Sequence, residues 1–250
     1  MSDQDAPLVV WEDEDLLVRA APGQTDTLVV AFTGVKFGLA GVPMTEFYGS
    51  ARGAEGHHIL FVSDLLRSWY SRPGLCDRVC RAITAYAAEH GITRLHAVGN
   101  SMGGYGALLL SDRLPFSSVL AFAPQVSMDP GVIRELRWIE FRPFFGRELA
   151  QSVNPNIARA ECPVTIVVGD GDAEDARQTA LLEPAENLTL FRIARGRHNA
   201  VRGLKDEGIL KPFMSAVFAG DRAEAEALIA AYEAEQVPAE VSLDMHGGVA

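Results

Sequence analysis

The stretch RLHAVGNSMGGYGALLL, residues 94–110, decides the fold class. Residues 94–98 form a short apolar run that predicts a strand, and the Ala-, Leu- and Gly-rich residues 101–113 predict a helix. Between them lies the motif G-x-S-x-G, with Gly99, Ser101 and Gly103. A sharp strand-to-helix turn strains the serine backbone and exposes its hydroxyl, and glycines without a Cβ let the two elements approach closely. The alternative is a glycine-rich turn with an incidental serine.

Other short apolar runs predict further buried strands on both sides of this motif. They cover residues 27–32, 58–62, 118–122, 164–168 and 188–193, and residues 9–11 and 16–19 read as an edge hairpin. Helical patterns cover residues 75–86, with Gly91 as a C-cap, and residues 176–182 and 222–235. Because strands and helices alternate, we expect an α/β fold with a mostly parallel sheet and helices on both faces.

Composition limits the class of protein. The chain has 250 residues, 48% of them hydrophobic, and a formal net charge of −11. This hydrophobic content excludes a disordered chain, and the acidity argues against nucleic acid as the main partner. We expect one domain over residues 1–250, with a short insert at about 124–161 and a loosely attached tail at about 237–250.

Membrane, targeting and metal signals are not found in the sequence. No apolar run approaches the ~20 residues that span a bilayer, and residues 1–11 do not resemble a signal peptide. The three cysteines, Cys76, Cys80 and Cys162, have no metal-ligand or redox spacing, and Cys76 and Cys80 read as packing residues. We therefore expect a cytoplasmic protein without a metal.

A serine hydroxyl needs a base to act as a nucleophile at neutral pH. His198 follows the last predicted strand, at the edge of the sheet where ligands bind. The other histidines fit less well, because they precede a strand, end a helix, lie within a strand or belong to the tail. They are His57, His58, His90, His96 and His246.

A carboxylate must orient the imidazole, and three aspartates follow the strand at 164–168. We favour Asp172, since a few residues beyond the strand let its side chain turn back toward the histidine loop. Asp170 is the second candidate, and Asp175 is expected to cap the next helix. The chain order Ser101, Asp172, His198 is one of the known orders for this set of groups.

Two backbone N–H groups are candidates for an oxyanion hole. One belongs to Met102, directly after the serine, and the other to Val35, after the strand at 27–32. Gly34 permits a tight turn that directs the Val35 amide inward. The alternative is an ordinary turn at the end of a strand.

These features resemble the α/β-hydrolase superfamily over roughly residues 28–202. The resemblance rests on the turn at 99–103, the segment 162–172 and the loop 196–198. It implies an eight-stranded, mostly parallel sheet, a serine nucleophile and no cofactor. Many members have His-Gly where this chain has Thr33 and Gly34, which leaves the second oxyanion donor open.

The insert and the loops carry the available signals for substrate. Aromatic residues of the insert alternate with arginines. This pattern predicts either a helix packed on the core or a small lid over the pocket. The residues are Trp138, Phe141, Phe144 and Phe145, with Arg134, Arg137, Arg142 and Arg147. Trp138 and Trp69 are candidate substrate contacts, although Trp69 and Tyr70 fit core packing equally well. Positive charges near the predicted histidine suggest an anionic group on the substrate. They belong to Arg195, Arg197, Arg202 and Lys205.

The expected function is hydrolysis of a small-molecule ester or thioester through an acyl-enzyme, with Ser101, His198 and Asp172 as a triad. Three alternatives remain: acyl transfer to another acceptor by the same residues, a catalytically idle binding protein on the same fold, and, less well supported, a peptidase. The oligomeric state is not predicted.

Overall fold

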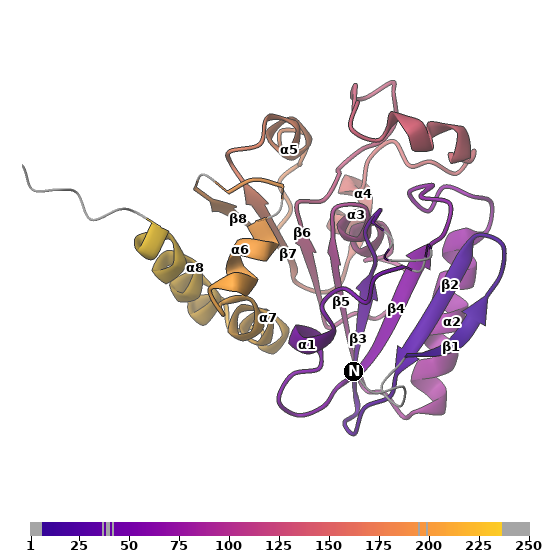
Figure 1. Ribbon diagram of the computed structural model, residues 1–250, viewed down its shortest axis with the longest axis horizontal. Coiled ribbons are helices and arrows are strands. Elements are labelled where there is room, and N and C mark those ends of the chain that lie inside the picture. Colours follow the sequence, from indigo (N-terminus) through magenta and orange to yellow (C-terminus); the bar gives the residue numbers. More distant parts are fainter. Residues whose placement is uncertain are drawn as a thin grey trace, which may run out of the picture.

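The computed structural model describes residues 7–36, 38, 41, 43–194, 196–198 and 200–236, and Figure 1 shows the arrangement of its elements. The predicted tail at 237–250 lies outside the described residues. The described strands form one eight-stranded sheet with the order β1-β2-β4-β3-β5-β6-β7-β8. Their bounds are β1 Leu8–Glu12, β2 Leu16–Ala21, β3 Thr27–Phe32, β4 His58–Asp64, β5 Arg94–Asn100, β6 Ser118–Phe122, β7 Val164–Gly169 and β8 Leu188–Ile193.

The sheet is mostly parallel, which confirms the predicted fold class. Strands β3 to β8 run parallel to their neighbours, whereas β2 pairs antiparallel with both β1 and β4. The strands predicted as continuous apolar runs are buried along β3, β4, β6 and β7. Burial on both faces of the sheet explains why these runs do not alternate with polar residues.

Helices cover both faces of the sheet. Those described are α1 Tyr48–Ala51, α2 Leu75–Glu89, α3 Met102–Leu109, α4 Asn154–Arg159, α5 Ala173–Thr179, α6 Ala200–Asp206, α7 Leu210–Ala219 and α8 Arg222–Gln236. Residues of α2, α3 and α4 share one apolar cluster with the sheet, and residues of α1, α6, α7 and α8 share the other. Figure 1 shows α2 and α8 far apart, on opposite sides of the sheet.

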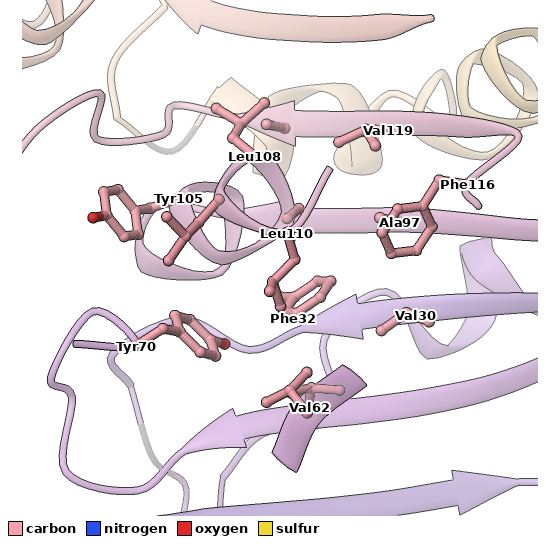
Figure 2. Close-up of a cluster of buried hydrophobic side chains, with 14 of the residues drawn as sticks. Val30, Phe32, Val62, Tyr70, Ala97, Tyr105, Leu108, Leu110, Phe116 and Val119 are labelled. Carbon is pink, nitrogen blue, oxygen red and sulfur yellow. The ribbon is translucent and has the colours of Figure 1, made fainter. Parts of the chain in front are cut away.

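The first apolar cluster lies under the turn that contains Ser101. Figure 2 shows Val30 and Phe32 of β3 and Val62 of β4 in the same cluster as Tyr105 and Leu108 of α3. Each of these five side chains is fully buried. The helix that begins at the serine turn is therefore held on the sheet by apolar contacts along its length.

The insert at 124–161 contains a 3-10 helix, η3 Ile139–Phe144, and α4. It lies with α5 at the top of Figure 1, on the side of the sheet where β7 ends. Trp138, Phe141 and Phe145 pack against the first cluster, whereas Phe144 is largely exposed. The packed-helix interpretation thus describes most of the aromatic residues, although the helix is a 3-10 turn with Pro143 inside it.

Sequence patterns predicted α2, α3, α5 and α8, but α5 begins at Ala173, three residues before the predicted start. They did not predict α1, α4, α6 or α7. The first three of these span only 4, 6 and 7 residues, which is too short for a clear helical period. Cys76 and Cys80 pack against the first cluster, as predicted.

Gly103→Ala tests the close approach of helix and strand. A Cβ at Gly103 would lie 2.1 Å from the carbonyl oxygen of Phe32, a backbone atom that cannot move aside cheaply. We expect a loss of at least ~2 kcal/mol in the free energy of unfolding, measured by urea denaturation. Gly49→Ala in α1 is the control, because a Cβ there meets nothing within 4 Å. Equal stability of the two variants would contradict this packing.

Candidate active site

Ser101 occupies the strained turn between β5 and α3. Its φ of 56° and ψ of −119° are unusual for a residue with a side chain. A Cβ at Gly99 would lie 2.2 Å from the backbone of Gly103, so only glycine fits there. The Ser101 N–H donates to the carbonyl of Phe122 on β6 at 2.9 Å, which fixes the turn to the sheet. The predicted serine turn is therefore present in the structure.

His198 lies in the loop between β8 and α6, and it meets Ser101. The distance from His198 Nε2 to Ser101 Oγ is 3.0 Å. The other described histidines hydrogen-bond elsewhere: His57 to Thr25, His58 and His90 to Tyr86, and His96 to Ser118. His246 lies outside the described residues. The structure thus brings the predicted serine and the predicted histidine together.

Asp175, and not Asp172, contacts the histidine, so the predicted triad acid is corrected. The oxygens Oδ1 and Oδ2 of Asp175 lie 2.8 and 2.9 Å from His198 Nδ1. Asp172 instead accepts the N–H groups of Glu174 and Asp175 as the N-cap of α5. The two predicted roles are therefore exchanged. Because helical side chains point back toward the N-terminus, Asp175, in the first turn, is directed at the histidine loop.

Arg137 of the insert shares Oδ1 of Asp175 with His198. Its Nη1 donates to Asp175 Oδ1 at 2.7 Å, and its Nη2 and Nε donate to Glu135 at 2.8 and 3.0 Å. Burial lowers the pKa of the Arg137 guanidinium, but its bonds to Glu135 and Asp175 outweigh burial and raise that pKa above its usual value. Arg137 is therefore a cation held by Asp175 and Glu135, neither a solvated side chain nor a free cation at the rim.

Burial explains why this network needs both carboxylates and the cation. Asp175 and Glu135 are 2% and 1% exposed, and an unpaired charge at either position would be costly. Gln178 donates a further bond to Glu135 at 3.3 Å. The network is a buried chain in which each charged group has a partner.

A cavity of about 780 Å³ opens beside Ser101 and His198. The predicted Gly34, Val35 and Trp138 line it, together with residues of α1, α6 and the loop before α1. Trp69 does not line it, because this side chain is fully buried in the core, so its prediction as a substrate contact is wrong. Tyr70 is fully buried as well.

The rim of the cavity carries charges of both signs. Lys36, Arg202 and Lys205 line it along with Glu46 and Asp206, and Arg202 pairs with Asp206 at 3.5 Å. Arg195 lies outside the described residues.

One predicted oxyanion donor lies at the start of α3, and the other lies in the loop after β3. Met102 is the first residue of α3, where backbone N–H groups have no partner within the helix. Val35 lines the cavity in the loop after β3. The N–H of its neighbour Gly34 donates to Glu46 at 3.3 Å, so the Glu46 carboxyl supports this loop.

Glu46 is an ionisable residue in the cavity that sequence patterns did not indicate. Burial raises the pKa of its carboxyl from 4.5 to about 7, more than the bond from Gly34 and the charge of Lys36 lower it. A carboxyl in contact with the loop after β3 therefore changes its charge near neutral pH.

Sequence patterns did not indicate Glu46, the contact of Arg137 with Asp175, or Gln125, whose Nε2 lies 3.2 Å from Ser101 Oγ. For the acid, a signal did exist: Asp172-x-x-Asp175 has the spacing of a capping box, with the cap at its first position. For Gln125, Glu46 and Arg137, no local spacing marks the contact, since each reaches the site through the fold.

No group of three or more His, Cys, Asp or Glu side chains in the described part of the chain is placed to hold a metal ion. Of the helices described, none is both long and apolar enough to cross a membrane.

Comparison with known proteins gives structural relatives only. No family model matches the chain, and no curated protein matches its sequence. Est1E from Butyrivibrio proteoclasticus superposes with a TM-score of 0.58 at 16% identity, over 85% of this chain and 99% of that one.

Two further solved structures have the same overall shape. The capsule O-acetyltransferase of Neisseria meningitidis serogroup A has a TM-score of 0.54 at 15% identity, over 79% of this chain and 91% of that one. A serine hydrolase involved in carbazole degradation has a TM-score of 0.52 at 14% identity, over 83% and 96%. Together with the sheet order and the serine turn, these similarities show that the chain has the fold of the α/β-hydrolase superfamily.

Proposed function

We propose that the protein is a serine hydrolase that cleaves a carboxylic ester or thioester through an acyl-enzyme. The observation that carries the proposal is the unbroken chain of contacts from Ser101 Oγ to His198 Nε2 at 3.0 Å and from His198 Nδ1 to Asp175 at 2.8 Å. The nucleophile thus lies within hydrogen-bond distance of the base, and the base lies within hydrogen-bond distance of the group that orients it.

The geometry supports a two-step reaction. His198 Nε2 takes the Ser101 proton as Oγ attacks the carbonyl carbon, and Asp175 stabilises the imidazolium through Nδ1–H. The N–H groups of Met102 and Val35 hold the negative oxygen of the tetrahedral intermediate. His198 then gives the proton to the leaving alcohol or thiol, and a water molecule activated by the same imidazole releases the acid.

The substrate in this proposal is a small molecule. The cavity volume of about 780 Å³ is within the usual range for small-molecule sites. The proposal includes an anionic group on the substrate, because the cavity is lined by Lys36, Arg202 and Lys205. Part of their positive charge is offset by Glu46 and Asp206.

Acyl transfer is the second candidate, because the same residues form the acyl-enzyme in both reactions. The cavity has room for an acceptor beside the acyl group, and one structural relative is named as an O-acetyltransferase. Product analysis with and without an added alcohol or amine separates the two. Free acid as the main product in both cases supports the hydrolase, and capture of most acyl groups by the acceptor supports the transferase.

Ser101→Ala tests the nucleophile. We expect turnover of short p-nitrophenyl esters to fall by at least about 10³-fold, since no other group can take up the acyl chain. The circular dichroism spectrum should not change, because alanine lacks only the hydroxyl. Retained turnover in this variant would place the nucleophile elsewhere.

Asp175→Asn and Asp172→Asn form a matched pair for the acid. Asparagine at position 175 removes the charge that stabilises the imidazolium, so kcat should fall by about 10³-fold or more. Asparagine at position 172 still caps α5, since asparagine is as good an N-cap as aspartate, and kcat should change less than about threefold. Steady-state kinetics of both variants decide the assignment, and the opposite ranking would return the role to Asp172.

Glu46→Gln tests the buried carboxyl at the oxyanion loop. Its pKa is raised from 4.5 to about 7, so the folded state holds the proton more tightly than the unfolded state does. The wild-type free energy of unfolding should therefore fall as the pH rises between these two values, by ~1–3 kcal/mol. Glutamine cannot ionise, so the variant should lack this loss and gain on the wild type between pH 5 and pH 8. Urea denaturation at both pH values measures it, and an unchanged difference between the two proteins would contradict the raised pKa.

A further inference from the structure

A buried amide contacts the oxygen of the proposed nucleophile in addition to the imidazole of His198. Gln125 follows β6, at a sharp turn where Ala123 has a φ of 39°, and its side chain is fully buried. Its Nε2 lies 3.2 Å from Ser101 Oγ. Its Oε1 lies 3.0 Å from the indole Nε1 of Trp69. The proposed mechanism assigns no role to this side chain.

Trp69 fixes which way the amide points. An indole N–H can only donate, so the oxygen of the Gln125 amide must face Trp69. The NH₂ group therefore must face Ser101. This orientation follows from the chemistry of the two groups, even though the oxygen and nitrogen of an amide look alike by shape.

The fixed amide in turn sets the direction of the serine proton. The Gln125 NH₂ group cannot accept a hydrogen bond, so Ser101 Oγ must accept from it. The Ser101 hydrogen is then left to point at its other neighbour, His198 Nε2, 3.0 Å away. This requires an unprotonated Nε2, which matches an Nδ1–H held by Asp175.

The loop that contains Trp69 has a strained backbone and is held in place by hydrogen bonds to Asp64. Arg67, Trp69 and Tyr70 have φ values of 52°, 53° and 59°. Asp64, fully buried at the end of β4, accepts the N–H groups of Ser68 and Tyr70 at 2.8 and 2.9 Å. A non-glycine residue with positive φ costs free energy, so three in one loop indicate that the position of the indole is specified by its surroundings.

Two aromatic side chains of the insert also pack against the indole of Trp69. The ring of Phe145 packs edge-on against Trp69 with centroids 5.5 Å apart, and Phe141 lies 6.2 Å away. Trp69 was predicted as a substrate contact, and the structure gives it a different position. It lies in the core, with its polar edge turned toward the amide that contacts Ser101.

We propose that Gln125, oriented by Trp69, directs the Ser101 hydroxyl proton to His198 and donates to Oγ as that proton leaves. The inference rests on the proposed function and adds Gln125 to the residues that act on the reacting oxygen. Trp69 is a positioning residue, since it acts only through Gln125. No bond forms or breaks at either side chain.

Gln125→Glu tests the proposal at nearly constant shape. An ionised carboxylate accepts the serine proton and competes with His198, whereas the protonated acid can still donate to Oγ as the amide does. We expect kcat to fall with KM unchanged within about twofold. The ratio of wild-type to variant kcat should rise by at least about tenfold between pH 6 and pH 9. A purely structural role would give a ratio that does not follow the ionisation of the new acid.

Gln125→Met and Trp69→Phe separate the donor from its orientation. Methionine removes the donor without adding a charge, so kcat should fall by about tenfold at every pH. Phenylalanine at position 69 frees the amide to rotate, and kcat should fall by less. Trp11→Phe is the matched control, because its indole also donates a hydrogen bond, to Asp13 at 2.9 Å on the edge strand β1. That variant should keep wild-type kcat.

A readout that needs no turnover separates this inference from the proposed function. In protein labelled with ¹⁵N-histidine, the Nε2 resonance of His198 reports whether the serine hydroxyl donates to it. At pH 8 it should shift in Gln125→Glu and stay unchanged in Trp11→Phe. An unchanged resonance in Gln125→Glu, or equal kcat of this variant and the wild type across the pH range, overturns the inference. If the wild type is inactive but the His198 resonance still shifts in Gln125→Glu, only the proposed function is overturned.

Discussion

The strained backbone at Ser101 is the constraint on which the rest of the site depends. A positive φ at this residue is tolerated because Gly99 and Gly103 let the helix approach the strands to within backbone contact. The apolar cluster shown in Figure 2 then holds α3 against the sheet. With the serine fixed in this way, the loops after β6, β7 and β8 need only to end at the same edge of the sheet for Gln125 and His198 to reach Oγ and for Asp175 to reach His198.

Buried charge is the second organising feature, and it connects the insert to the proposed chemistry. Oδ1 of Asp175 contacts both the imidazole of His198 and the guanidinium of Arg137, and Glu135 pairs with the same arginine. The insert therefore does more than cover the core, because two of its charged residues, Arg137 and Glu135, belong to the network that holds Asp175. A change in the packing of the insert would therefore alter the surroundings of His198 through the guanidinium group of Arg137.

The sequence allowed the sheet, the serine turn and the histidine to be predicted, because each has a local signature. Buried parallel strands are continuous apolar runs, and the turn requires glycines at fixed spacing. Asp172 was predicted to contact the histidine because the start of α5 was placed three residues too late, so the helix cap and the carboxylate that contacts His198 were exchanged. Gln125 and Glu46 could not be predicted, since their contacts join residues from separate loops. Trp69 was misplaced because an aromatic residue after a strand fits a pocket and a core equally well.

The central claim is that Ser101, activated by His198, is a nucleophile. A fluorophosphonate probe, followed by digestion and mass spectrometry, tests it most directly, because the probe bonds only to an activated serine and the adduct identifies the residue. The account predicts one adduct, on Ser101, that forms far more slowly in a His198→Ala variant. An unlabelled protein, or an adduct on a different serine, would contradict it.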